Sequence, residues 1–366
     1  MAAKEEKTNP FTQETGVIHL GGIDAIVRLT LDQVRTDARR GLKTGMFVSG
    51  YRGSPVGMLD AALIRQQKLL LEKNIHFVDG INEDLAATAV WGTQMLHTVG
   101  KQKLDGVTGL WYGKAPGVDR SGDALKHANY TGIGKNGGVL AIAGDDPSCK
   151  SSSLCSQSEP MLFHLGIPSL YPGNVQEILD LGLHGYQMSR LAGVWMGMKI
   201  VTNVADGSGS ALVSPERLDF ITPDLEFDGQ LFTPRMNLGM NVRAEALEME
   251  QSLYTRRLEV AKRYAAANKL NNVVFPPYEQ VIPREFRRRA AALRDELIDA
   301  LKRAEVMAPE KTATVRVQLD KGTLQLTADN PDLGVAHQEI EIEYQGEPLV
   351  AGFNARYLIE VLEVMD

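Results

Sequence analysis

Several common sequence signals are absent from this chain of 366 residues. Only two cysteines occur, Cys149 and Cys155, which excludes a disulfide framework and favours a reducing compartment. The N-terminal segment is polar and lacks the apolar core of a signal peptide. No apolar run is long enough to span a membrane. These absences predict a cytoplasmic protein with no membrane partner.

Metal and dinucleotide signatures are missing as well. The seven histidines show no metal-ligand spacing, and there is no four-cysteine run for an iron–sulfur cluster. The segment GIGKNG at 132–137 fits the glycine pattern of a dinucleotide-binding turn, but it precedes an apolar strand instead of joining a strand to a helix. A Rossmann interpretation therefore fails, and no metal site is predicted.

Charge is distributed unevenly along the chain. The formal net charge of −7 gives no general indication of nucleic-acid binding. From Phe275 onward, 11 Lys and Arg stand against 17 Asp and Glu, a net of −6, which leaves −1 for all earlier residues. Within this acidic part, 284–303 is locally basic, with seven basic and four acidic residues.

Short apolar runs alternate with helical patterns over about 44–200. The runs lie at 45–50, 75–80, 106–113, 138–144, 167–173 and 193–203. This alternation predicts an α/β fold with a parallel sheet that helices cover on both faces. Four strands are followed by loops of small and polar residues, at the sheet edge where ligands collect in such folds. These residues are also ordinary turn formers, but four such loops together favour a ligand site.

The segment GINEDLAATAVWG places two acids in the first turn of a helix. Asn82 is the expected N-cap, and Glu83 and Asp84 follow it. Acids at these positions ordinarily stabilise the helix dipole, which is one explanation for them. Glu83 also follows the carboxyl end of a strand directly, and the small residues of its helix would allow a ligand to approach closely. A functional role for Glu83 is the alternative explanation.

Four ordered segments, GYRGSPVGMLD, INEDLAATAVWGTQ, APGVDRSGDALKHAN and GDDPSCKSSSLCSQSEP, resemble the N-terminal part of the indolepyruvate ferredoxin oxidoreductases over about 15–273. The resemblance implies a polar tail over 1–14, a thiamine-diphosphate pyrimidine-binding domain over 15–205 and a following oxidoreductase segment over 206–273. It implies an enzyme that oxidatively decarboxylates a 2-oxoacid such as indolepyruvate and passes electrons to ferredoxin. In complete form this enzyme is expected to be a homo-oligomer.

The same resemblance assigns site residues. Glu83 falls where the family's glutamate contacts the thiamine aminopyrimidine and helps to form the reactive ylid, which makes it the catalytic residue. Asn82 and Ser54 join it as cofactor-binding residues. Arg52, Ser54 and Arg120 are candidates for holding the 2-oxoacid, although turn serines and surface arginines are common. The family's motif for Mg²⁺ and diphosphate and its iron–sulfur and ferredoxin-binding domains have no counterpart here, so the chain alone is expected to be inactive.

From Phe275 the chain resembles an unrelated family. FPPYEQVIPREFRRRAAALRDELIDALKRAEVM, VRVQLDKGTLQLTADNPDLGVAHQEIEIEYQGEPL and GFNARYLIEVLEVM look like the third domain of the bacterial β sliding clamp, the processivity factor of DNA polymerase III, over about 275–366. An α+β fragment is expected. Its predicted elements are a helix at 289–306, strands at 314–319 and 322–328 joined by a tight DKG turn, a strand pair from 335 to 351 and a helix at 354–364.

This second resemblance implies DNA as a partner. Clamp helices face the DNA phosphates, which the basic stretch 284–303 would suit, although a solvated helix face accounts for the charge equally well. Pro276, Gln280 and Val281 fall where the clamp's peptide-binding pocket has part of its wall, but Gln280 stands where a basic residue is expected. Since the first two clamp domains are missing, no closed ring is expected from this fragment alone.

The stretch AANKLNNVVFPPYEQVIPREF, at 266–286, is therefore interpreted as a junction between two interrupted proteins rather than as a linker. The leading interpretation is part of a thiamine-dependent oxidoreductase. The alternatives are a fragment of a sliding clamp and a structural or interaction protein that kept both folds.

Overall fold

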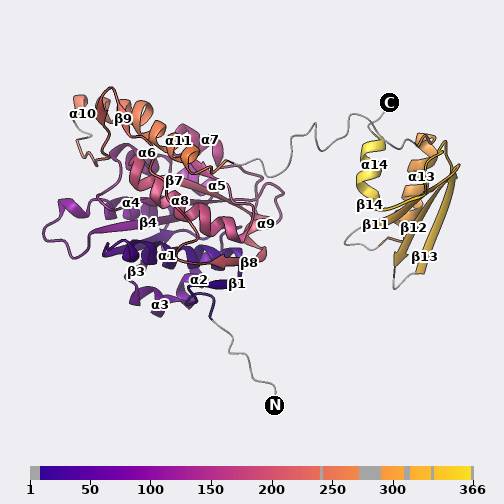
Figure 1. Ribbon diagram of the computed structural model, residues 1–366, viewed down its shortest axis with the longest axis horizontal. Helices are drawn as coiled ribbons and strands as arrows, with labels where there is room; N and C mark the ends of the chain where they lie inside the picture. The colour runs from indigo at the N-terminus through magenta and orange to yellow at the C-terminus, as the bar shows by residue number, and fades with distance from the viewer. Residues whose placement is uncertain (1–8, 240–241, 272–289, 309–313, 331–333, 364–366) are drawn as a thin grey trace, which may run out of the picture. The chain divides into compact units, whose positions relative to one another are not determined.

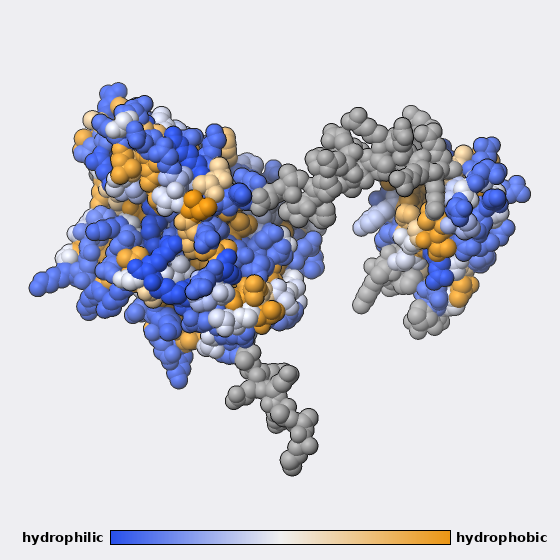
Figure 2. Space-filling view, viewed as in Figure 1, coloured by the Kyte–Doolittle hydropathy of each residue, from blue (hydrophilic) through white to orange (hydrophobic). Residues whose placement is uncertain are grey.

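The structure is a computed structural model that describes residues 9–239, 242–271, 290–308, 314–330 and 334–363 (Figure 1). The chain forms two compact units, Met1–Asn272 (unit 1) and Val273–Asp366 (unit 2). No helix among these residues is long and apolar enough to cross a bilayer. The face of the protein seen in Figure 2 is mostly hydrophilic, with hydrophobic side chains in small patches.

Unit 1 is built on a six-stranded parallel sheet, which confirms the predicted α/β class. The strands are β2 (Thr44–Gly50), β3 (Ile75–Phe77), β4 (Gly106–Lys114), β5 (Val139–Asp145), β6 (Ser169–Leu170) and β7 (Met196–Val201). Their order is β3-β2-β4-β5-β7-β6, and every neighbouring pair is parallel. The run predicted at 167–173 contributes only the two residues of β6, an edge strand.

Alternate residues of a strand point to opposite sides of the sheet, and here both sides carry apolar side chains. Helices therefore cover both faces. Leu110 and Tyr112 pack in the core under α1 (Gly22–Arg39) and α8 (Val175–Ala192). Trp111, between them, packs on the other face of the sheet in a second core with α4 (Glu83–Thr93), α5 (Ala115–Arg120) and α6 (Gly122–Thr131). The two cores hold the sheet between helical layers.

The remaining elements of unit 1 lie around these layers. β1 (Gly16–Gly21) pairs with β8 (Ser208–Val213) in a separate antiparallel ribbon. A helical segment closes the unit and runs through α10 (Arg243–Ser252), a π-helical turn η2 (Leu253–Arg257) and α11 (Leu258–Ala267). The short elements are α2 (Leu59–Arg65), α3 (Gln67–Glu72), η1 (Leu96–Thr98), α7 (Glu159–His164), α9 (Thr202–Ala205), β9 (Glu226–Phe227) and β10 (Gln230–Leu231).

The described part of unit 2 is a four-stranded antiparallel sheet with helices α13 and α14 packed on it (Figure 1). Its elements are α13 (Arg294–Glu305), β11 (Thr314–Asp320), β12 (Thr323–Asn330), β13 (Gly334–Glu341), β14 (Leu349–Asn354) and α14 (Ala355–Glu363). The predicted DKG turn is confirmed, because Asp320 pairs with Thr323 and Gly322 adopts a φ of 79° that favours glycine. Helix α13 buries Ile298, Leu301 and Ala304 at helical spacing against the sheet.

The strand pair predicted from 335 to 351 is wrong in its pairing. β13 pairs with β12 and β14 pairs with β11, so the two lie at opposite edges of the sheet in the order β13-β12-β11-β14. The β11–β12 hairpin takes the centre because its two-residue turn joins these strands first. Local pattern reveals strands, but it does not reveal which edge each strand joins.

A buried histidine makes the stability of unit 1 depend on pH. His184 of α8 is 6% exposed, and its Nδ1 lies 3.0 Å from the hydroxyl of Tyr264. Burial lowers the pKa of His184, and Asp180 opposes this only in part. The unfolded chain therefore binds the proton more tightly, so the free energy of unfolding should fall as pH drops below about 6.5, the ordinary histidine value.

On acidification the free energy of unfolding should fall by about 1.4 kcal/mol for each tenfold difference in proton affinity of His184 between the folded and unfolded chains. We expect thermal melts of His184→Gln between pH 7.5 and 5.5 to show a weaker pH dependence than the wild type. The matched control is His19→Gln, at an exposed position of β1. Equal pH dependence in all three proteins would show that His184 does not carry the effect.

Candidate functional site

The carboxyl ends of β2, β3, β4, β5 and β7 lie along one edge of the parallel sheet, where the predicted site residues follow them. The chain leaves β2 toward β3 on one side and leaves β4 toward β5 on the other. Such a reversal of strand order opens the crevice in which α/β proteins bind ligands. This edge was therefore the first candidate site.

Glu83 lies at this edge as the first residue of α4. Asn82 caps the helix as predicted, because its Oδ1 accepts the N–H of Leu85 at 2.9 Å. The Glu83 side chain is 94% buried, as only 6% of the residue is exposed, and it packs against Gly117 of α5. A Cβ at Gly117 would lie 2.8 Å from Glu83 Oε1, so glycine is needed there. Among the described residues no donor or cation contacts this carboxylate.

The two candidate arginines are each held by acids nearby. Arg52 lies 3.7 Å from a carboxylate oxygen of Asp60 and 3.8 Å from one of Asp79. Arg120 donates from Nε to Asp84 Oδ1 at 3.1 Å. Both arginines are more than half exposed. The described contacts do not join either arginine to Glu83, so the structure does not bring the candidates together around one anion.

Ser54 meets the loop that follows β5. Its hydroxyl hydrogen-bonds to that of Ser151, and the Ser152 hydroxyl donates to the Ser54 carbonyl at 3.4 Å. Asp146 organises this loop by accepting the N–H groups of Ser151 and Ser152, each at 2.9 Å. Donation from the Ser151 N–H is the main cause that lowers the pKa of Asp146. The Ser54 hydroxyl is thus already engaged by the protein itself.

A buried ion cluster at the ends of β5 and β7 was missed by the sequence analysis. Lys199 Nζ lies 3.4 Å from Asp145 Oδ2 and donates to Glu159, while Ser158 donates its N–H to Asp145 at 2.9 Å. Burial raises the pKa of Asp145 against the opposing effect of Ser158 and Lys199. The paired acids directly after an apolar strand, in GDDPS, were the only local signal for it. Among the described residues no group of His, Cys, Asp or Glu could hold a metal ion.

The helical face of unit 2 carries cations that are also paired. Lys302 Nζ lies 2.7 Å from Glu363, and Arg356 Nε lies 2.6 Å from Glu305, so two ion pairs join α13 to α14. Arg303 donates to the side chain of Gln338 at 2.9 Å. The candidate pocket residues Pro276, Gln280 and Val281 lie outside the described residues, as does 284–289 of the basic stretch.

Comparison with known proteins identifies relatives of the C-terminal part. Residues 279–366 match the family described as DNA polymerase III beta subunit, C-terminal domain. The beta sliding clamp of Pseudomonas aeruginosa is 36% identical over 102 residues, which are 28% of this chain and 28% of that protein. The beta sliding clamp of Caulobacter vibrioides is 33% identical over 122 residues, 33% of this chain and 32% of that protein.

A crystal structure of the DNA polymerase III subunit beta from Pseudomonas aeruginosa has 38% sequence identity and covers 25% of this chain and 26% of that chain, with a TM-score of 0.24. The chain thus spans less than a third of the length of these clamp relatives. The predicted clamp C-terminal domain is confirmed over 279–366.

These matches overturn the oxidoreductase interpretation. The relatives are sliding clamps, so the assignment as a thiamine-dependent enzyme that acts on a 2-oxoacid and reduces ferredoxin is wrong. The prediction that the protein uses thiamine diphosphate with Mg²⁺ is therefore wrong as well. The resemblance rested on loops of small polar residues and on a capped helix start, which any α/β fold uses for turns and caps. The roles assigned to Glu83, Asn82, Ser54, Arg52 and Arg120 stay predictions.

Proposed function

We propose that this chain acts through residues 279–366 as a DNA-associated sliding-clamp domain of the DNA polymerase III system. The observation that carries the proposal is the match of 279–366 to the clamp C-terminal family. The proposed partners are duplex DNA and a further clamp subunit. A clamp acting on bacterial DNA works in the cytoplasm, the compartment expected from the cysteine content.

Most basic residues in the described part of unit 2 lie on its helices. The described part of unit 2 has six basic residues, and four of them lie on α13 and α14: Arg294, Lys302, Arg303 and Arg356. The same helices carry six acidic residues: Asp295, Glu296, Asp299, Glu305, Glu360 and Glu363. Acidic residues follow one another along the strand edge, at Glu339, Glu341 and Glu343. The helical cations can contact DNA phosphates, and the acids beside them keep such contacts weak.

The ion pairs on the helices are compatible with weak, exchangeable contacts to DNA phosphates. Lys302 and Arg356 are each more than half exposed, and exposed ion pairs contribute little to stability. A phosphate can therefore replace the acid at little cost. Contacts of this kind read no base sequence and weaken as salt rises, as a clamp that slides along DNA requires.

Removal of two helix charges tests the proposal. We expect Lys302→Gln/Arg303→Gln to weaken binding of the full chain to a fluorescent duplex in anisotropy titrations. If each side chain contacts one phosphate, the slope of log affinity against log salt should fall by about 1.8. The matched control is Lys68→Gln/Lys73→Gln, which removes the same charge from exposed positions of unit 1. An equal loss in both variants, or no duplex binding by wild type at low salt, would sink the proposal.

A further inference from the structure

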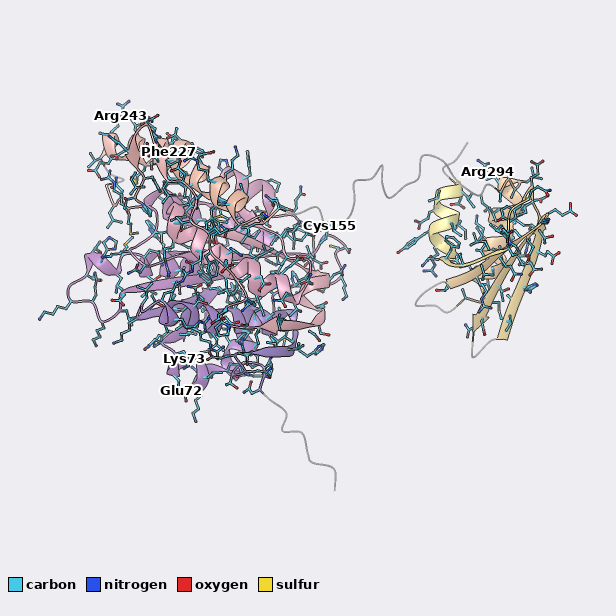
Figure 3. All side chains as sticks on the ribbon, in the orientation of Figure 1. Glu72, Lys73, Cys155, Phe227, Arg243 and Arg294 are labelled. Atoms are coloured by element: carbon cyan, nitrogen blue, oxygen red, sulfur yellow. The ribbon has the colours of Figure 1, made fainter. Side chains whose placement is uncertain are left out.

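A cationic hollow of about 260 Å³ lies in unit 1 and is lined by residues between 227 and 257. It is bounded by the β9–β10 strand pair and by the helical segment around η2. The residues that matter in its lining are Phe227, Arg235, Glu248, Ser252, Arg256 and Arg257. Figure 3 labels Phe227 and, near it, Arg243 at the start of α10. The lining contains three arginines and one glutamate.

The π-helical turn η2 brings the polar side chains of the hollow together. Ser252, Arg256 and Arg257 are separated by four and five residues, and all three line the hollow. In an α-helix a residue at i+5 turns away from residue i, but the wider π turn keeps it on the same side. Single π turns of this kind are common at functional sites.

Arg257 supplies a fixed positive charge to the hollow. It is buried, and its two Nη atoms donate to four backbone carbonyls, those of Asn129, Gly193, Tyr130 and Met249, at 2.7 to 3.1 Å. Burial lowers the pKa of Arg257 to about 10, so the group stays charged at neutral pH. No carboxylate among the described residues pairs with it. The remaining donor, Nε–H, has no hydrogen-bond partner among them.

The other two arginines are oriented but weakly held. The Arg256 guanidinium lies over the ring of Phe227, 4.8 Å from its centroid, and also pairs with Asp228. Arg235 pairs with Glu248. Asp228 and Glu248 are both more than half exposed, so each pair contributes little. An incoming dianion with three oxygens can displace both acids and gain charge-assisted, bidentate hydrogen bonds.

We propose that this hollow binds the phosphate group of a small phosphate monoester. Its volume is slightly below that of ordinary ligand pockets, which run from about 300 to 1,000 Å³, so the ligand must be small. Arg235 and Arg256 supply the forked donors that match a phosphate, Arg257 supplies the buried positive charge, and the Ser252 hydroxyl is available to a phosphate oxygen. The proposal is independent of the clamp function.

Calorimetric titration of the full chain with glycerol 3-phosphate tests this proposal. We expect saturable binding, with no binding of glycerol. Arg235→Gln/Arg256→Gln should weaken binding at least tenfold, because two charge-assisted hydrogen-bonding groups are lost. The control, Arg243→Gln/Lys68→Gln, removes the same charge at exposed positions outside the lining and should change affinity less than twofold.

Weaker binding by the double arginine variant could also result from misfolding, so a variant that is expected to bind more tightly serves as a second test. Glu248→Gln removes the acid that competes for Arg235, so glycerol 3-phosphate should bind about two- to fivefold more tightly. Failure of wild type to bind glycerol 3-phosphate in the millimolar range would overturn the proposal. So would an equal loss in the control variant, weaker binding by Glu248→Gln, or sulfate and inorganic phosphate binding as tightly as the monoester.

Discussion

Replacement of Arg257 by methionine is expected to lower the free energy of unfolding of unit 1 by about 3–5 kcal/mol. Only 4% of Arg257 is exposed, and its guanidinium joins segments that lie far apart in the chain. Two of the carbonyls that it satisfies, those of Asn129 and Tyr130, belong to the last turn of α6, and a third, that of Gly193, ends α8. Methionine would leave these buried acceptors without donors.

Urea unfolding followed by tryptophan fluorescence measures this loss, because all three tryptophans of the chain lie in unit 1. Arg256→Met is the matched control. It makes the same change one residue earlier, at a position that is 36% exposed in its side chain, and should cost no more than about 1 kcal/mol. A loss below about 1 kcal/mol for Arg257→Met would show that water replaces the guanidinium at the carbonyls.

Replacement of Leu301 by alanine should destabilise unit 2 by about 3 kcal/mol and leave unit 1 folded. Leu301 is fully buried in a core that includes 13 of the described residues, from α13, α14, the sheet and its connections. A unit of this size has a small margin of stability, so one cavity removes much of it. The proposed DNA binding should weaken with the fold, since the helical cations lose their framework.

Hydrogen exchange resolved by peptide separates the two units in one experiment. Peptides from unit 2 should exchange faster in Leu301→Ala, while peptides from unit 1 and the tryptophan fluorescence should not change. Leu293→Ala is the control, because Leu293 precedes the same helix and is 69% exposed. If exchange rose equally in both units, the units would unfold together, which would contradict the expectation that their cores are independent.

Local features of the fold were predictable from sequence because short-range interactions decide them. Asn82 was recognised as an N-cap from residue type alone, since only a few side chains satisfy the first N–H groups of a helix. The DKG turn was recognised for a similar reason, because Gly322 permits the positive φ of that turn. The apolar runs at 45–50 and 106–113 became β2 and β4 almost residue for residue.

The candidate site in unit 1 was predicted less well. The polar loops lie at the carboxyl ends of the strands as predicted, but a ligand site there stays a prediction, and loop composition suggested an enzyme family that the clamp relatives overturn. Capping acids and turn serines serve structure in many folds, so their presence did not specify chemistry. The clamp domain was recognised because its similarity extends over whole strands and helices rather than over loops.

The sequence alone determined the α/β class of unit 1, the strands and helices of unit 2 and the similarity of 279–366 to the clamp C-terminal family. Each depends on periodicity, caps and turns within a few residues, where backbone geometry restricts the choices. Only the tertiary structure decided that Arg257 reaches a carbonyl 128 positions away in sequence and that Arg190 meets Asp37 across 153. It alone placed β13 and β14 at opposite edges and brought three arginines around one hollow. Such contacts depend on how whole elements pack, and no local pattern encodes that packing.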